Sequence, residues 1–387
     1  MKPIRVVFAG GGTGGHVYPA IAMYEGLLAR GGTVEALFVG VKGGMESQLL
    51  AKRNVRLVLL PGRGVRGASL WGKLMAPLEL ARGVFAAVGV LRAFRPDVVV
   101  GTGGYASVSA VLAAVILRRP RILQEQNSVP GLANRLLARF ADVMLLSYEE
   151  SRSRLPRGVR TVVIGNPLRI APGKAREARE AREAGARALG LDPSRHTVLV
   201  IGGSRGAHSL NVAASSAVER LLGETGLQWI LLTGERDCDE MRGRFAPHGD
   251  RVVVRAYLED VQHAYGVADV AVARAGASAV FELAAFGIPS IFVPYPYAAD
   301  GHQRLNVEPL RRQGGAVVIE DVNLSGERLA EEITALLRDG PRRERMSRVL
   351  TGWARVDAAE SAAEKIVELC ARSRQKGRRR DLREGVA

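Results

Sequence analysis

The chain has 387 residues, of which 47% are hydrophobic and 24% charged, and its formal net charge at pH 7 is +16. This length accommodates two domains with full hydrophobic cores, and the globular composition excludes a fibrous or wholly disordered chain. The two cysteines, Cys238 and Cys370, lack the spacing of a metal site. We therefore expect no disulfide framework, which fits a reducing compartment.

The termini and the charge exclude further classes. Residues 4–9 form a strand-like apolar stretch instead of a secretory signal. The longest membrane-like run, residues 106–117, is shorter than the about 20 residues that a spanning helix needs. The positive charge favours anionic partners such as nucleic acid, acidic lipid or phosphate-bearing substrates. Because aromatic residues make up only 5% and no RNA-recognition pattern is present, we expect no nucleic acid partner.

Short apolar runs alternate with helical patterns along the chain, which predicts parallel sheets covered by helices. In the first half, the expected strands are residues 4–9, 35–39, 55–60, 98–101, 121–124 and 143–146. Helical patterns lie between them at residues 19–30, 45–52 and 131–140. The alternation then starts again, with strands expected at residues 197–201, 229–233, 251–255, 270–273, 290–293 and 316–319. The sequence therefore predicts an α/β chain of two Rossmann-like, doubly wound parallel-sheet domains.

The junction between the domains falls between residues 165 and 195. The repeated Ala-Arg-Glu at residues 175–183 is typical of a solvated helix with local ion pairs. We expect an N-terminal domain of residues 1–168, a C-terminal domain of residues 169–354 and a last helix at residues 355–371. The basic tail, residues 372–387, is expected to be disordered.

Three glycine-rich turns each follow an expected strand, at residues 10–16, 101–107 and 202–207. Glycine lets the backbone approach a ligand closely, and the amides that begin the next helix attract an anion. Gly10, Gly12 and Gly15 also fit the dinucleotide spacing G-x-G-x-x-G, but the second strand ends without the acid that a nicotinamide dinucleotide site needs, which disfavours a dehydrogenase. The three turns predict a cleft that holds two phosphate-bearing substrates.

Six short segments, taken together in this order, carry a further signal. They are residues 11–20 (GGTGGHVYPA), 125–127 (EQN), 165–169 (GNPLR), 202–207 (GGSRGA), 274–282 (RAGASAVFE) and 300–303 (DGHQ). Together with Asn306, they resemble the MurG family of UDP-N-acetylglucosamine–N-acetylmuramyl-(pentapeptide) pyrophosphoryl-undecaprenol N-acetylglucosamine transferases. The resemblance implies the GT-B fold, in which an acceptor-binding N-terminal domain and a donor-binding C-terminal domain flank a cleft. It also implies that the last helix crosses back to the N-terminal domain.

By this resemblance the donor is UDP-N-acetylglucosamine and the acceptor is undecaprenyl-pyrophosphoryl-MurNAc-pentapeptide. The muramyl 4-hydroxyl attacks the anomeric carbon with inversion and expels UDP, in peptidoglycan biosynthesis and without a cofactor. We expect a monomer or weakly associating chain at the cytoplasmic face of the bacterial plasma membrane. A UDP-N-acetylglucosamine 2-epimerase of the same fold is the alternative, which the segments around Gly103 and Glu125 disfavour.

The resemblance assigns donor contacts residue by residue. Glu282 is expected to accept both ribose hydroxyls; the alternative is an acid in the first turn of a helix that only stabilises the helix dipole. Ser204 and Arg169 are expected to hold the diphosphate. The backbone of Leu258 is expected to meet the uracil, and Gln303 the sugar hydroxyls. The remaining expected donor-binding residues are Thr13, Gly14, Gly15, Asn127, Ala277, Ser278, Ala279, Val280 and Phe281.

His16 is the candidate general base, because imidazole titrates near neutrality and His16 follows the first glycine turn. The alternative is a histidine that bonds a phosphate or holds the loop. Glu125 is the second catalytic candidate, as a base or as a substrate positioner. The first two glycine turns are expected to hold the acceptor diphosphate through backbone amides. The expected acceptor-binding residues are Gly14, Gly103, Gly104, Tyr105 and Gln126.

An apolar stripe at helical spacing consists of Trp71, Leu74, Met75 and Leu78, with basic residues nearby. Core packing produces the same pattern. The resemblance, however, implies an apolar patch ringed by basic residues on the N-terminal domain, and the basic flanks favour peripheral binding to anionic membrane lipid.

Asp237 and Asp239 flank Cys238 in a D-x-D pattern that raises the question of a metal site. They lie in a strongly polar stretch after Gly234. We expect a solvent-facing loop there and no metal, since helix dipoles and cations are able to stabilise the departing UDP.

Overall fold

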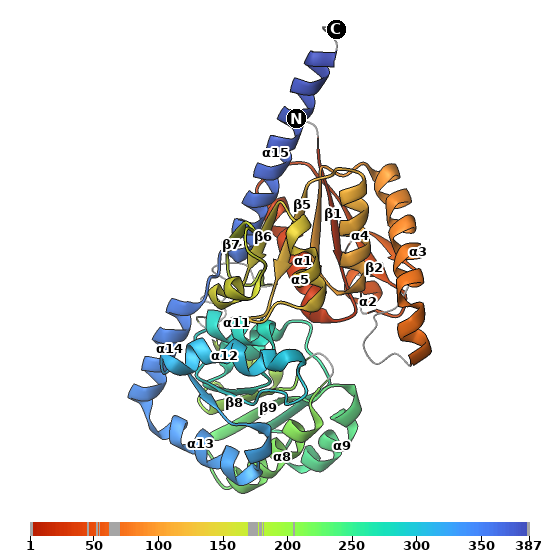
Figure 1. Ribbon diagram of the computed structural model, residues 1–387. Helices are drawn as coiled ribbons and strands as arrows, with labels where there is room; N and C mark the ends of the chain where they lie inside the picture. Colours follow the sequence, from red (N-terminus) through yellow and green to blue (C-terminus); the bar gives the residue numbers. More distant parts are fainter. Residues whose placement is uncertain are drawn as a thin grey trace. The chain divides into compact units, whose positions relative to one another are not determined.

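The computed structural model describes residues 3–44, 46–51, 53, 55–61, 70–168, 177, 180, 182–203 and 206–384, with side chains at all of these except residues 70–74 and 376–384. The chain divides into two compact units (Figure 1). Unit 1 consists of Met1–Arg169 and Asp357–Ala387, and unit 2 of Ile170–Val356. Each unit has its own parallel sheet and its own core.

The described residues of unit 1 form a seven-stranded sheet of order β3-β2-β1-β4-β5-β6-β7. Its strands are β1 (Ile4–Gly10), β2 (Val34–Val41), β3 (Arg56–Leu60), β4 (Val98–Gly103), β5 (Arg121–Glu125), β6 (Val143–Leu146) and β7 (Thr161–Val163). Its helices are α1 (Gly14–Ala29), α2 (Glu46–Ala51), α3 (Leu70–Phe94), α4 (Gly104–Ile116), α5 (Leu132–Leu137), the 3-10 helices η1 (Ala138–Phe140) and η2 (Glu149–Arg154), and α15 (Ala358–Glu384). The sequence missed β7, a three-residue strand at the sheet edge that is too short for its pattern to stand out.

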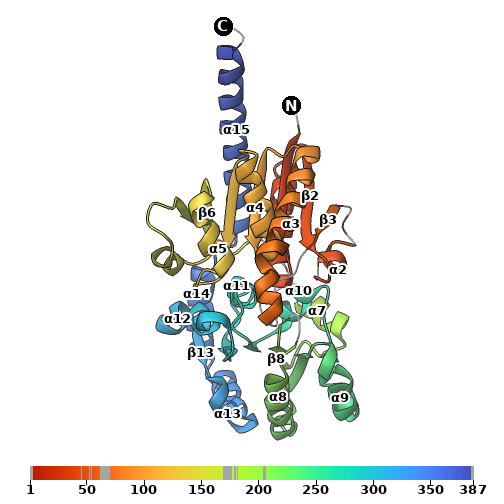
Figure 2. The same ribbon diagram turned by 45° about the vertical axis from the view of Figure 1, so that its right-hand side comes forward.

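Two apolar layers cover the faces of this sheet, as strand alternation requires. Val6 and Phe8 of β1 pack with α1 and α15 on one face, and Val7 and Ala9 pack with α3 and α4 on the other. Figure 2 shows α3, α4 and α5 next to one another. Burying each large apolar side chain contributes about 1.5–3 kcal/mol, so both helical layers are needed to hold the sheet.

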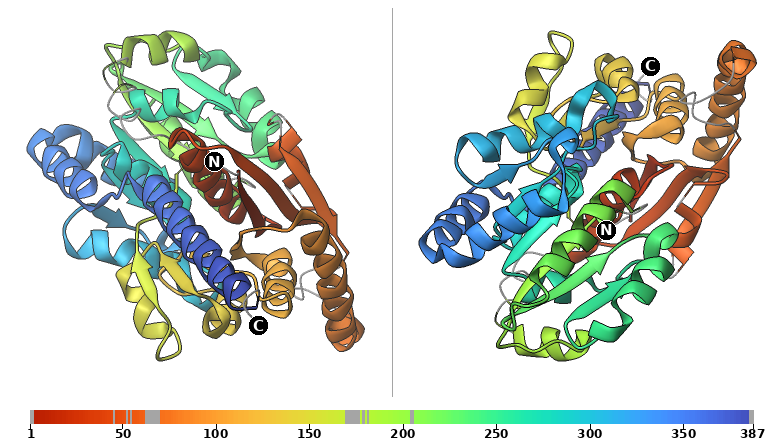
Figure 3. Two further views of the ribbon diagram at one scale, coloured as in Figure 1. Left: turned by 90° about the horizontal axis from the view of Figure 1, so that it is seen from above. Right: turned by 90° about the horizontal axis from the view of Figure 1, so that it is seen from below.

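Helix α15 corrects one expectation. Residues 372–387 were expected to be disordered, but α15 continues to Glu384 and packs against α1 (Figure 3). The guanidinium group of Arg374 donates hydrogen bonds of 2.7 Å to Asp97 and to the carbonyl oxygen of Pro3. These bonds hold α15 against the rest of unit 1 beyond the apolar part of the helix. The high charge of the tail had predicted disorder because it does not show this contact.

The described residues of unit 2 form a six-stranded sheet of order β10-β9-β8-β11-β12-β13. Its strands are β8 (His196–Ile201), β9 (Leu227–Leu232), β10 (Val252–Arg255), β11 (Val270–Ala273), β12 (Ser290–Phe292) and β13 (Ala316–Val318). Its helices are α7 (Arg182–Leu189), α8 (His208–Leu221), α9 (Glu235–Phe245), η3 (Ala246–His248), α10 (Val261–Val267), α11 (Ala277–Ala285), η4 (Ala299–Gly301), α12 (His302–Arg312), η5 (Asp321–Asn323), α13 (Gly326–Arg338) and α14 (Gly340–Trp353). Both units are therefore doubly wound parallel sheets, as the alternating pattern predicted.

Candidate active site

In unit 1 the strand order reverses between β1 and β4, and in such sheets ligands bind beside the carboxyl ends of the strands at the reversal. The first glycine-rich turn (residues 10–16), called the first glycine loop below, begins at the end of β1. The second (residues 101–107), called the second glycine loop, begins at the end of β4. The two loops touch: the Thr102 hydroxyl donates a 2.8 Å hydrogen bond to the carbonyl oxygen of His16. A Cβ atom at Gly104 would lie 2.7 Å from the carbonyl oxygen of Gly11, and Gly104 has a φ of 78°. Only glycine allows this approach.

The first loop presents the amino end of α1. Thr13 is the N-cap residue in extended conformation, and its carbonyl oxygen accepts from the amides of His16 and Val17 at 3.1 and 3.3 Å. The first amides of a helix lack acceptors within the helix and attract anions. The backbone at Gly14 and Gly15 therefore suits a phosphate group.

The imidazole of His16 lies between the two loops. Its Nδ1 atom is 3.0 Å from the carbonyl oxygen of Gly11. Since a carbonyl oxygen only accepts, Nδ1 carries the proton, and in the neutral ring Nε2 then has a lone pair. A Cβ atom at Gly103 would lie 2.9 Å from Nε2. This geometry holds the loop and also leaves Nε2 chemically suited to act as a base.

Glu125 lies at the end of β5 and is 1% exposed. Its Oε1 atom accepts from the backbone and side-chain amides of Asn127, at 2.9 and 3.3 Å. Its Oε2 atom accepts from the Gly131 amide and from Asn134 Nδ2, both at 2.9 Å. A carboxylate engaged by four donors shapes the turn that carries Asn127, so the geometry favours positioning over proton transfer.

Two expected acceptor contacts have other partners. The buried Gln126 side chain donates a 2.8 Å hydrogen bond to the carbonyl oxygen of Thr102 and thereby supports the second loop from within. The Tyr105 hydroxyl donates a 2.5 Å hydrogen bond to the carbonyl oxygen of Glu79 on α3. Burial raises the pKa of Tyr105 above its usual value. The hydroxyl of Tyr105 thus joins α4 to α3.

Glu46, which no sequence motif indicated, is a buried residue at the start of α2. Its Oε1 atom accepts a 2.9 Å hydrogen bond from the amide of Gly12. Cβ atoms at Gly11 and Gly44 would overlap its carboxylate, and one at Gly40 would lie 2.9 Å from its Cγ atom. The glycines at the end of β2 are the signal for it: they make room for a side chain beneath the first loop.

In unit 2 the strand order reverses between β8 and β11. Arg169 and Ser204, expected at the diphosphate, lie outside the described residues. The described part of the third glycine loop includes Gly206, whose φ is 73° and where a Cβ atom would overlap the carbonyl oxygen of Thr233. The loop leads into α8 at His208.

The D-x-D segment is not the solvent-facing loop that was expected. Asp237 and Cys238 are buried in α9. Asp237 accepts from Asn211 Nδ2 at 2.7 Å and lies 3.1 Å from Nδ1 of His208, both on α8. Within the part of the chain that the structure describes, no group of three or more His, Cys, Asp or Glu residues is arranged to hold a metal ion.

Helix α11 follows β11 and begins after Gly276, its N-cap residue. Ala277, Ser278 and Ala279 form its first turn and present their backbone. The side chains of Val280 and Phe281 are buried in the core, where Phe281 packs on Trp353 with ring centroids 4.5 Å apart. The amide of Val280 donates a 3.0 Å hydrogen bond to the carbonyl oxygen of Gly276, so its expected contact with the donor stays a prediction, as does that of Phe281.

Glu282 lies in the second turn of α11, which rules out the alternative of a first-turn acid that only stabilises the dipole. The carboxylate is 5% exposed, and its Oε2 atom accepts a 2.5 Å hydrogen bond from the Tyr265 hydroxyl. It lies on the helix that follows β11, beside the strand reversal at which ligands bind in such sheets.

Two further expected residues lie on other segments of unit 2. Gln303, at the start of α12, accepts a 2.9 Å hydrogen bond from the Tyr295 amide. Asp300, just before it, has a φ of 52°, so the turn that presents Gln303 is strained. Leu258 lies between β10 and α10, half-buried against the core.

Arg274 directly follows β11, and its motif alone did not indicate a role for it. Its buried guanidinium donates to Asp321 at 2.6 Å, to the Ser209 hydroxyl at 2.7 Å and to the carbonyl oxygen of Val293 at 3.1 Å. It therefore ties the ends of β11 and β12 to the first turn of α8.

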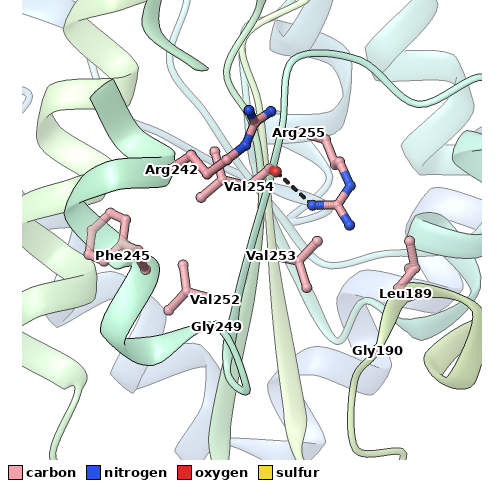
Figure 4. Close-up of a pocket in the computed structure, with 10 residues that line it drawn as sticks. Leu189, Gly190, Arg242, Phe245, Gly249, Val252, Val253, Val254 and Arg255 are labelled. Atoms are coloured by element: carbon pink, nitrogen blue, oxygen red, sulfur yellow. Dashed lines mark hydrogen bonds between the residues drawn. The ribbon is translucent and has the colours of Figure 1, made fainter. Parts of the chain in front are cut away.

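A separate hollow of about 320 Å³ lies along β10, the edge strand, lined by Leu189, Arg242, Phe245 and Arg255 among others (Figure 4). Strand β9 separates β10 from the reversal point at β8. The residues that line the hollow include neither Glu282 nor a residue of the third glycine loop, so it is not the candidate site of unit 2.

Known proteins match this chain over most of its length. The model of the glycosyltransferase family 28 N-terminal domain matches residues 6–146, and that of the family 28 C-terminal domain matches residues 197–366. The chain belongs to glycosyltransferase family 28. The UDP-N-acetylglucosamine–N-acetylmuramyl-(pentapeptide) pyrophosphoryl-undecaprenol N-acetylglucosamine transferase of Chlorobaculum tepidum is 40% identical over 370 residues, covering 95% of this chain and 99% of that protein. The Geobacter sulfurreducens enzyme of the same name is 38% identical over 365 residues, covering 94% and 98%.

Solved structures agree with this membership. The crystal structure of Acinetobacter baumannii MurG has a TM-score of 0.72 and 28% identity, covering 95% of this family 28 chain and all of that one. The UDP-GlcNAc 2-epimerase from Neisseria meningitidis has a TM-score of 0.67 at 13% identity, covering 96% of this chain and 100% of that one, and shares the fold alone. The predicted GT-B class and the predicted resemblance to MurG enzymes are confirmed.

Proposed function

We propose that this enzyme transfers N-acetylglucosamine from UDP-N-acetylglucosamine to the 4-hydroxyl of undecaprenyl-pyrophosphoryl-MurNAc-pentapeptide, as a step of peptidoglycan biosynthesis. The observation that carries the proposal is the match to relatives of that name over nearly the full length of the chain. In addition, many of the expected site residues lie within the described part of the chain. These lie at or beside the carboxyl ends of the strands in each sheet. The 2-epimerase alternative has only the likeness of fold in its support.

Unit 2 binds the donor in this proposal. Glu282 accepts the ribose hydroxyls, since a carboxylate offers acceptors to both members of a diol. The amides that begin α8 and α11 stabilise the diphosphate, whose negative charge grows as UDP leaves. Ser204 and Arg169 are assigned to the same diphosphate because of the family's sequence motifs. Gln303 contacts the sugar, and Leu258 the uracil.

Unit 1 binds the acceptor. The first and second glycine loops hold its diphosphate through the backbone of Gly14, Gly103 and Gly104. Gln126 supports the second loop through its buried hydrogen bond to Thr102, and the buried carboxylate of Glu125 shapes the turn that carries Asn127. The assignments of Thr13, Gly15 and Asn127 to the donor sugar stay predictions.

His16 is the proposed base. Its Nε2 atom takes the proton of the muramyl 4-hydroxyl while that oxygen bonds to the anomeric carbon. The bond from the anomeric carbon to the β-phosphate oxygen breaks, and its electron pair leaves with UDP. The bond from His16 to Gly11 keeps the protonated Nδ1 atom turned away from the reaction.

The enzyme is proposed to bind peripherally to anionic lipid at the cytoplasmic face of the plasma membrane. The side chains of Trp71 and Leu74 lie outside the described residues, and Met75 is half-buried. Leu78 is 53% exposed on α3, and Phe85, two turns further along and missed in the sequence, is 79% exposed. In the described part of the chain, no helix is both long and apolar enough to cross a bilayer.

The test uses labelled UDP-N-acetylglucosamine with and without the lipid-linked muramyl pentapeptide. We expect labelled disaccharide lipid only when the acceptor is present. Formation of labelled N-acetylmannosamine without acceptor, either still bound to UDP or released from it by hydrolysis, would establish the epimerase instead, and the absence of all these products would refute the proposal.

A further inference from the structure

We infer that Tyr265 is a positioning residue for the donor: its hydroxyl fixes the carboxylate of Glu282 in the orientation that receives the ribose. This inference rests on the proposed function, in which Glu282 accepts the ribose hydroxyls. It adds a residue on a different helix, whose role is to select a nucleotide with an intact ribose diol.

The hydrogen bond is short and shielded from water. The Tyr265 hydroxyl on α10 lies 2.5 Å from Oε2 of Glu282 on α11, and Tyr265 is 2% exposed. A hydroxyl that donates to a carboxylate forms a charge-assisted bond of about this length, roughly twice as strong as a neutral one. In a buried setting, water is not available to replace the donor.

The tyrosine ring itself is held in place. It packs against Phe286, with ring centroids 5.1 Å apart, in the core below α11. Because Phe286 and Glu282 belong to the same segment, the ring and its hydroxyl move with the carboxylate that they orient. The site is thus preorganised, and little entropy is lost when the ribose binds.

This arrangement solves a physical problem of a buried ribose-binding acid. Burying a carboxylate is unfavourable unless donors satisfy it. A free carboxylate also rotates, whereas a diol needs both acceptor directions in one plane. By donating to Oε2, Tyr265 compensates part of the burial and sets the plane of the carboxylate.

The experiment compares UDP with 2′-deoxy-UDP, by calorimetry on the full-length protein. Tyr265→Phe keeps the ring and removes only the hydroxyl. We expect about tenfold weaker binding of UDP, in line with hydrogen bonds to charged groups, and less than a twofold change for 2′-deoxy-UDP. In turnover assays, we expect the KM for the donor to rise while kcat at saturating donor stays within twofold.

Three controls separate the possible causes. Tyr24→Phe removes a hydroxyl in unit 1, where Tyr24 packs against Phe8 and Phe38, and is expected to leave both affinities unchanged. In a Glu282→Gln background, Tyr265→Phe is expected to add less than twofold. Circular dichroism melting verifies that each variant is folded.

Two results would overturn the inference: undiminished binding of UDP by Tyr265→Phe, or equal weakening of UDP and 2′-deoxy-UDP, which indicates a merely structural role. The proposed function fails separately. If Glu282→Gln itself binds UDP as tightly as the natural protein, the assignment of the ribose site is wrong, whatever Tyr265 does.

Discussion

The amide of Gly12 donates a 2.9 Å hydrogen bond to Oε1 of Glu46, a buried residue more than thirty positions along the chain. Three glycines, Gly11, Gly40 and Gly44, leave the space that this carboxylate fills. The bond ties the first glycine loop, proposed to hold the acceptor diphosphate, to helix α2. Glu46 therefore shapes the loop without itself facing a substrate.

Replacing Glu46 tests this support. We expect Glu46→Ala to raise the KM for the lipid acceptor by about tenfold, because losing a hydrogen bond to a charged group costs about 1.5–3 kcal/mol. Glu46→Gln retains an oxygen that accepts from Gly12, and we expect it to keep most of the activity. The affinity for UDP, a property of unit 2, serves as the control. Equal losses in the two variants would show that charge matters and the hydrogen bond does not.

The second loop requires glycine at position 104. Gly104→Ala places a Cβ atom 2.7 Å from the carbonyl oxygen of Gly11 at a φ of 78°. We expect a loss of about 1–3 kcal/mol in the free energy of unfolding, measured with urea, and a marked loss of turnover. Gly89→Ala on α3, where the added atom meets nothing within 4 Å, is the matched control and is expected to be neutral or slightly stabilising. Similar unfolding curves for the two variants would contradict the steric argument.

His16 has two possible roles, which separate by substitution. If Nε2 is the base, His16→Ala lowers kcat by about 10²–10⁴-fold. His16→Asn keeps a donor that reaches the carbonyl oxygen of Gly11 but lacks a base. We expect both variants to be equally slow in steady-state assays. Recovery of turnover in the asparagine variant would assign His16 to loop support, and near-normal turnover of the alanine variant would remove it from catalysis.

The exposed side chains of α3 predict membrane binding. We expect Phe85→Glu to reduce binding to vesicles that contain anionic lipid, because it replaces an exposed apolar side chain with a carboxylate that the lipid headgroups repel. Trp71→Glu tests the stripe predicted from the sequence, and we expect it to reduce binding as well. Sedimentation with vesicles measures the bound fraction. Val322→Glu, at an exposed position of unit 2, is the control and should bind as the natural protein does. Unchanged binding of folded Phe85→Glu would count against the patch.

The buried thiol of Cys370 on α15 is expected to make the free energy of unfolding fall as the pH rises above about 9. Burial, and secondarily the charge of Asp97, raises the pKa of its thiol from 9.0 to about 12. A raised pKa in the folded state contributes stability that is complete below pH 9 and is lost as the pH rises toward 12, since only the unfolded chain releases the proton there. Relative to Cys370→Ala, the natural protein should lose about 1 kcal/mol between pH 8 and pH 10 in urea titrations. A pH-independent difference would show that the thiol ionises freely in the folded state.

The local pattern of the sequence determined the strands, the helices and the glycine turns. Runs such as residues 4–9 and 197–201 are apolar on both faces, which only a strand covered on two sides explains, and each is followed by glycines that a helix follows in turn. The family motifs then indicated Glu282 and His16. All of this information lies within a few neighbouring residues, so one sequence sufficed to read it.

Tertiary structure alone decided which side chains meet. The bonds from Gly12 to Glu46 and from Tyr265 to Glu282 join different elements of the chain, and Arg374 reaches Asp97 from the last helix. Only the tertiary structure shows that the Tyr105 hydroxyl bonds to α3 and that α15 continues into the basic tail. The physical reason is that periodicity defines the apolar face of each helix, whereas the order of the strands and the packing of the helices define what each buried polar group contacts.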